Sequence, residues 1–136
     1  MMVEILAILF LVNPFIGHNV AASSLNDATN NVAVGGASMY TMTTADYNTA
    51  VGTSSLYTNS TANNNTAVGN RAGFYTTGAS NTYLGFKAGF GAAGAETHNT
   101  GVGANALLKI TDGGYNVSIG SRSGEDLTTG DFNVFI

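Results

Sequence analysis

The sequence contains no cysteine and no tryptophan, only one proline, and very few charges. Without cysteine it has no disulfide scaffold, no thiolate metal site and no cysteine nucleophile. Charged residues make up 9% of the 136 residues, against roughly 25% in ordinary soluble domains. The four cations, Arg71, Lys87, Lys109 and Arg122, are too few for the basic stripe that binds a phosphate backbone. Nucleic acid is therefore not an expected partner.

Long apolar runs are also missing. The longest run, Ile5 to Val12, falls well short of the ~20 residues needed to span a bilayer, so no membrane span is predicted. We interpret residues 1–12 as an apolar N-terminal segment that either caps the fold or is signal-like. Glu4, and the lack of Lys or Arg beside it, disfavours the signal peptide.

The residues that are abundant point to β-structure. Glycine, asparagine and threonine all weaken helix interiors, and they make up more than a third of the chain. Disorder is also disfavoured, because 44% of the residues are hydrophobic and the net charge is only −4. These two observations predict a folded all-β chain.

A pentapeptide that begins with Asn, has an aliphatic residue fourth and ends with Gly recurs along the chain. The copies begin 18, 17, 17, 16, 18, 17 and 17 residues apart, and the last stops before its Gly. This spacing predicts a parallel β-solenoid of about 17 residues and two short strands per coil, with eight coils in one repeat domain over residues 13–136. The interrupted last copy leads us to expect either a fragment of a longer fibre or a subunit whose open end is covered by a further copy of the chain.

Side chains alternate between the two faces of a strand, so the pentapeptide predicts which residues share a face. We expect the first-position asparagines to form a hydrogen-bonded structural ladder along the axis: Asn13, Asn31, Asn48, Asn65, Asn81, Asn99, Asn116 and Asn133. We expect the fourth positions to form an inward-facing core column: Ile16, Val34, Val51, Val68, Leu84, Val102, Ile119 and Ile136. The variable third position is then expected to meet solvent or a neighbouring chain.

The sequence contains a few motifs that are typical of catalytic or ligand-binding sites, but the residues around them do not match such sites. Residues 89–94 match the Gly-x-Gly-x-x-Gly dinucleotide pattern, but a turn and another pentapeptide follow where a helix is required. His18 and His98 have no neighbouring ligand or triad partner, and Glu125 and Asp126 are adjacent, so a strand points them to opposite faces. We therefore predict no catalytic, cofactor-binding or metal-binding residue, no cofactor, and no enzyme activity.

The repeats resemble those of a known family. Asn-Thr-Ala-Val-Gly at residues 48–52 and 65–69, followed by segments such as Ser55-Leu56-Tyr57 and Thr76-Thr77-Gly78, resembles the repeats of bacteriophage tail fibre proteins. It is also similar to the head repeats of trimeric autotransporter adhesins. The resemblance covers residues 13–136 and implies a parallel β-roll that associates as a homotrimeric rod for attachment to a cell surface.

The expected function is that of a structural tail fibre segment that supports host-cell attachment, located in the virion or on an extracellular surface. The expected partners are the chain itself, as a homotrimer or a head-to-tail stack, other fibre or virion proteins, and a cell-surface glycan or protein receptor. The alternatives are a bacterial surface adhesin and a self-assembling extracellular filament subunit. A minor alternative is an ice-binding solenoid, suggested by the column Thr49, Thr66, Thr82 and Thr100, although we expect that column to point inward.

Overall fold

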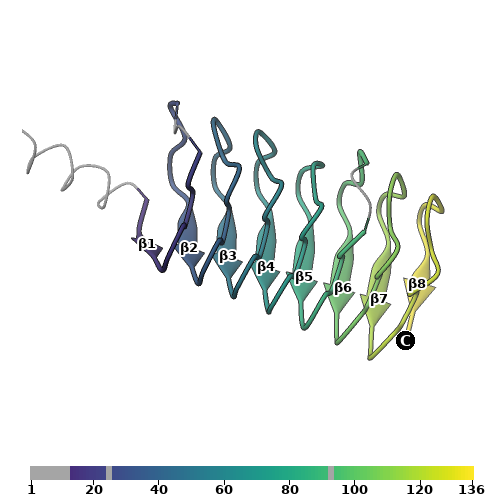
Figure 1. Cartoon of the computed structure of the whole chain (residues 1–136). Helices are drawn as coiled ribbons and strands as arrows, with labels where there is room; N and C mark the ends of the chain where they lie inside the picture. The colour runs from purple at the N-terminus through teal and green to yellow at the C-terminus, as the bar shows by residue number, and fades with distance from the viewer. Residues whose placement is uncertain (1–12, 24–25, 92–93) are drawn as a thin grey trace, which may run out of the picture.

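The computed structural model describes residues 13–23, 26–91 and 94–136; residues 1–12, interpreted above as a cap or signal-like segment, lie outside the described residues. The described part is a helix-free parallel β-solenoid, in which each coil contributes one short strand to a single sheet (Figure 1). The strands are β1 (Phe15–Ile16), β2 (Val32–Val34), β3 (Thr49–Val51), β4 (Thr66–Val68), β5 (Thr82–Leu84), β6 (Thr100–Val102), β7 (Val117–Ile119) and β8 (Val134–Phe135). Within these ranges no helix is long and apolar enough to cross a membrane.

The strands stack in sequence order, and every neighbouring pair is parallel. Equivalent repeat positions pair directly: Thr49 lies opposite Thr66, and Thr66 lies opposite Thr82. Each repeat position therefore forms a column along the rod. The predicted solenoid and its coil of about 17 residues are confirmed, with seven complete turns followed by β8 where eight coils were predicted.

The prediction of two strands per coil is wrong for the described residues. After the glycine corner the chain runs back through what we call the return segment, residues 53–60 in the coil of β3. Return segments do bond from coil to coil, as from Met39 N to Ser55 O (2.9 Å) and Leu56 N to Ala72 O (3.0 Å). They are not strands because each contains left-handed residues, here Ser54 (φ 57°) and Leu56 (φ 46°).

The prediction for the core column is also wrong. The third positions are inside, with Ala33, Ala50, Ala67 and Tyr83 fully buried, while the fourth positions face outward. Ile16, Leu84, Ile119 and Ile136 are exposed, and Val34, Val51, Val68 and Val102 are only partly buried. The reason is the asparagine: its buried amide shares a face with the third position, so the second and fourth positions must point out. We call this outward face of β1–β8 the sheet face.

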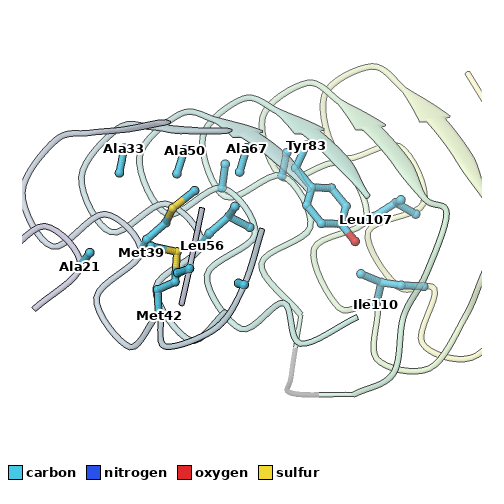
Figure 2. Packing of buried hydrophobic residues seen from close by; sticks show 14 residues of the cluster. Ala21, Ala33, Met39, Met42, Ala50, Leu56, Ala67, Tyr83, Leu107 and Ile110 are labelled. Atoms are coloured by element: carbon cyan, nitrogen blue, oxygen red, sulfur yellow. The ribbon is translucent and has the colours of Figure 1, made fainter. Parts of the chain in front are cut away.

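The interior is filled by small third-position residues and larger ones from the return segments (Figure 2). Ala50 belongs to the same coil as buried Leu56, whereas the large Tyr83 belongs to a coil that has Gly89 at the equivalent place. A Cβ on Gly89 would lie 2.2 Å from the Tyr83 ring. Large and small residues are thus complementary across the coil, which keeps its width nearly constant.

The corner after each strand requires glycine. Gly52 has φ 132°, and a Cβ there would lie 2.5 Å from the carbonyl oxygen of Gly69 in the next coil. The corner residues stack so closely that no side chain fits between coils. This glycine column sets the sharp turn that carries the chain from the sheet face to the return segment.

Candidate functional site

The asparagine ladder runs through the whole described repeat. In every step the backbone N–H of one Asn donates to the side-chain oxygen of the Asn one coil earlier, as from Asn65 N to Asn48 Oδ1 (2.8 Å). The side-chain amide then donates to a carbonyl of the next coil, as from Asn65 Nδ2 to Gly78 O (3.0 Å). The ladder contains Asn13, Asn31, Asn48, Asn65, Asn81, Asn99, Asn116 and Asn133. Because it is buried and its oxygens accept internal bonds, it is structural and offers no ligand site.

The sheet face forms an uncharged surface along the rod. It consists of the second and fourth pentapeptide positions, and none of them carries a charge. Its members are Pro14, Ile16, Val32, Val34, Thr49, Val51, Thr66, Val68, Thr82, Leu84, Thr100, Val102, Val117, Ile119, Val134 and Ile136. Threonine and branched aliphatic side chains thus form parallel columns over eight strands. Contiguous exposed apolar patches of this kind mark interaction sites.

The opposite side of the coil, which we call the return face, has a different chemistry. The return segment lies across the interior from the strand, since Ser118 Oγ donates to Ser123 O at 2.6 Å. Four rings form a half-buried ladder there, with centroids 4.9, 4.7 and 5.4 Å apart: Tyr40, Tyr57, Phe74 and Phe90. All four cations of the chain also lie in return segments. The return face therefore carries aromatic rings and charged side chains, including Glu125 and Asp126 beside the cations, whereas the sheet face is uncharged and consists of threonine and aliphatic side chains.

A second ring stack borders the sheet. His98, Tyr115 and Phe132 each precede a ladder asparagine and stack with centroids 4.6 and 5.0 Å apart. The rings lie face to face, so both faces of the central Tyr115 ring are covered, whereas Phe132 at the end of the stack is 77% exposed. His98 is thus a stacking residue, and it has no acidic or metal-ligating neighbour among the contacts described.

The interior contains one polar cluster that the sequence analysis missed. Glu96 is 2% exposed, and its Oε2 has no hydrogen-bond partner among the described residues; the same holds for the buried Tyr83 hydroxyl and Thr76 Oγ1. Burial raises the pKa of Glu96 to about 7 and raises the pKa of Tyr83 as well. The sequence contained a signal for this cluster. Three residues before six other ladder asparagines, from Asn31 to Asn133, stands Ala or Gly: Ala28, Ala45, Ala62, Gly78, Gly113 and Gly130.

The remaining candidates do not assemble into a reactive site. Glu125 and Asp126 are engaged by Arg122 (3.7 Å) and Lys109 (2.6 Å). In the part of the chain that the structure describes, no three His, Asp or Glu side chains gather as metal ligands. The described residues of the Gly89–Gly94 motif, Gly89 to Gly91 and Gly94, belong to a return segment and its connector, with no helix in the described residues that follow.

Comparison of the chain with family models, curated proteins and solved structures finds no match.

Proposed function

We propose that this chain is a rigid, self-associating rod segment of the tail fibre type, located in a virion or on an extracellular surface and supporting attachment to a cell. The observation that carries the proposal is the uncharged sheet face on a continuous solenoid. The resemblance of the repeats to phage tail fibres supports the same reading. A bacterial adhesin or a filament subunit would use the same rod in a different setting.

The solenoid supports a mechanical role. Each coil bonds to the next through the strand, the return segment and the asparagine ladder, so bending the rod must distort three sets of hydrogen bonds together. The coils share one interior of stacked side chains. A rod held in this way is stiffer than a string of separately folded domains joined by linkers.

The sheet face supports self-association. Leu84 is 47% exposed and Ile119 is 46% exposed, on a face with no charge to keep it hydrated. Burying such side chains contributes about 25 cal/mol per Å² of apolar surface. Two or three copies that place their sheet faces together would bury these columns side by side, with every coil of one rod meeting a coil of its neighbour. A homotrimer with the sheet faces at its centre is the arrangement we propose.

Sedimentation of the native protein tests the proposal. The double variant Val68→Lys with Leu84→Lys places two charges on the sheet face and is expected to convert a discrete trimer into monomers. The matched control is Thr44→Lys with Thr61→Lys, which adds the same charges at exposed connector positions of neighbouring coils. A wild-type monomer would contradict the proposal, whereas growth without limit would favour the head-to-tail filament.

Ice binding is a second candidate, because one structural observation favours it. The Thr49, Thr66, Thr82 and Thr100 column faces outward, contrary to the sequence-based expectation, and lies in register with the fourth-position aliphatic column. Thermal hysteresis above that of a control protein, lost in Thr66→Lys with Thr82→Lys, would support it. Hysteresis equal to the control would eliminate it.

A further inference from the structure

The four cations of the chain all lie in return segments, where Arg71, Lys87 and Arg122 share one repeat position and Lys109 lies four positions further along its own coil. Arg71, Lys87, Lys109 and Arg122 follow β4, β5, β6 and β7, so four successive coils carry one cation each. Coils in a parallel stack lie roughly 4.8 Å apart, which sets the spacing along the axis. The net charge of the chain is −4, yet the return segments carry these four cations against two carboxylates, Glu125 and Asp126.

Two of these cations lack a described acidic partner. Lys109 and Arg122 have the ion pairs given above, whereas Arg71 and Lys87 form no ion pair with a described carboxylate. They occupy the same repeat position on neighbouring coils, since Lys87 N donates to Asn70 O, next to Arg71, at 3.0 Å. Like charges at adjacent positions of paired segments are destabilising. The pair therefore weakens the isolated rod, and an anion placed between the two would remove that cost.

Aromatic rings hold both cations in place. The Arg71 guanidinium lies 6.0 Å from the centroid of Phe74, and the Lys87 ammonium lies 5.3 Å from the centroids of both Phe86 and Phe90. Cation–π contacts of this kind restrict the side chain and leave the outer part of the charge open to a ligand. The site is thus a set of positive charges beside ring surfaces.

A groove lies directly beside Lys87. The ring ladder ends at Phe90 because Leu108 occupies the equivalent position in the next coil, and Gly91 stands where the preceding coil has Tyr75. These two smaller residues leave an open cavity of about 360 Å³, which is within the usual ~300–1,000 Å³ of ligand pockets. The described residues that line it are Lys87, Phe90, Gly91, Leu108 and Lys109.

We propose that this groove and the adjacent Arg71 bind an acidic saccharide, a sugar chain that carries carboxylate groups. A pyranose ring has an apolar C–H face that fits against Phe90 and Leu108, and its carboxylate fits between the ammonium groups of Lys87 and Lys109. A second carboxylate farther along the chain then reaches Arg71. This inference rests on the proposed attachment function for its biological setting, and it assigns the ligand to the face opposite the one used for assembly.

The test is a binding titration with a hyaluronan hexasaccharide, which carries glucuronate carboxylates, against its carboxyl-reduced neutral counterpart. We expect the acidic probe to bind at least tenfold more tightly than the neutral one. Arg71→Gln with Lys87→Gln is expected to weaken binding at least tenfold, and Asp126→Asn, which releases Lys109 from its ion pair, to strengthen it. Arg122→Gln, the matched control, should remain within twofold of the wild type.

A structural readout separates binding from folding. Removing the unpaired like charges in Arg71→Gln with Lys87→Gln should leave the midpoint of thermal unfolding unchanged or raise it. Equal affinity for the acidic and neutral probes, unchanged affinity in the double variant, or tighter binding of an oligothymidine than of the saccharide would each overturn the inference. Sedimentation of the same samples measures self-association separately. A result that contradicts saccharide binding is therefore distinguishable from one that contradicts the proposed rod assembly.

Discussion

The backbone N–H and the side-chain amide of Asn48 both donate to one atom, the Oδ1 of Asn31, at 2.9 and 3.1 Å. One oxygen therefore satisfies two buried donors of the following coil. A ladder built in this way connects each coil to the next at the residue before each strand, where the backbone N–H donates to a side-chain oxygen, and it keeps the strands in register.

The ladder predicts that replacing one of its asparagines lowers the free energy of unfolding substantially. Asn65→Ala deletes the oxygen that accepts the N–H of Asn81 and the amide that donates to Gly78. With buried groups left unpaired, we expect the free energy of unfolding to fall by roughly 2–4 kcal/mol. Chemical denaturation measures it, and Asn70→Ala, at an exposed site, is the control. Equal losses in the two variants would contradict the structural role of the ladder.

The glycine corner predicts a position-specific loss. Gly52→Ala would place a methyl group 2.5 Å from Gly69 O at φ 132°, so it should lower the free energy of unfolding by at least ~3 kcal/mol. Gly36→Ala, at the next residue after another corner, has its nearest neighbour at 3.8 Å and should change stability little. Thermal unfolding compares the two, and a tolerated Gly52→Ala would mean that the coils are spaced more widely than described.

Glu96 predicts a pH dependence of stability. Its pKa is raised to about 7 in the native state by burial, whereas the unfolded value is about 4.3. The native state therefore holds the proton more tightly, so this contribution to stability is fully present below about pH 4.3 and is lost as the pH rises to about 7. The expected loss is on the order of 4 kcal/mol, from about 1.4 kcal/mol per pKa unit.

Denaturation of the wild type and of Glu96→Gln at pH 4 and pH 8 measures this effect. Glutamine keeps the size of the side chain and does not titrate, so the difference between the two proteins should change with pH in the direction given. Glu96→Ala, which restores the small residue found in the other coils, should be more stable than the wild type at pH 8. A difference between wild type and Glu96→Gln that is the same at both pH values would contradict the buried carboxyl.

Tyr83 predicts opposite effects for two substitutions. Tyr83→Phe removes a buried hydroxyl without a partner, so stability should be unchanged or higher by about 1 kcal/mol. Tyr83→Ala leaves the space beside Gly73, Gly89 and Gly101 empty and should cost about 3–5 kcal/mol. Calorimetry compares the two variants. A destabilised Tyr83→Phe would show that the hydroxyl has a hydrogen-bond partner, such as a buried water.

Most of the architecture was predictable because it follows from the short repeated sequence. The regular return of Asn and Gly fixes the coil length, the parallel stacking, the register and the ladder, since each feature needs only that equivalent residues lie above one another. The lack of cysteine excluded disulfides and thiolate sites, and the scarcity of cations argued against a nucleic-acid-binding surface. The return segment was predicted as a strand because its left-handed residues, such as Leu56 and Arg71, are not of the types that usually mark positive φ.

The tertiary structure decided which face is inside. Alternation along a strand tells which residues share a face, but it does not say which face is buried. That choice depends on the space left by residues on the other side of the coil: Tyr83 fits inside because Gly73 and Gly89 approach it from return segments. The same geometry buries Glu96, turns the threonine column outward, and brings Lys87 to Phe90 beside a groove. The sequence determined the coil, whereas packing across the coil decided the two faces on which function depends.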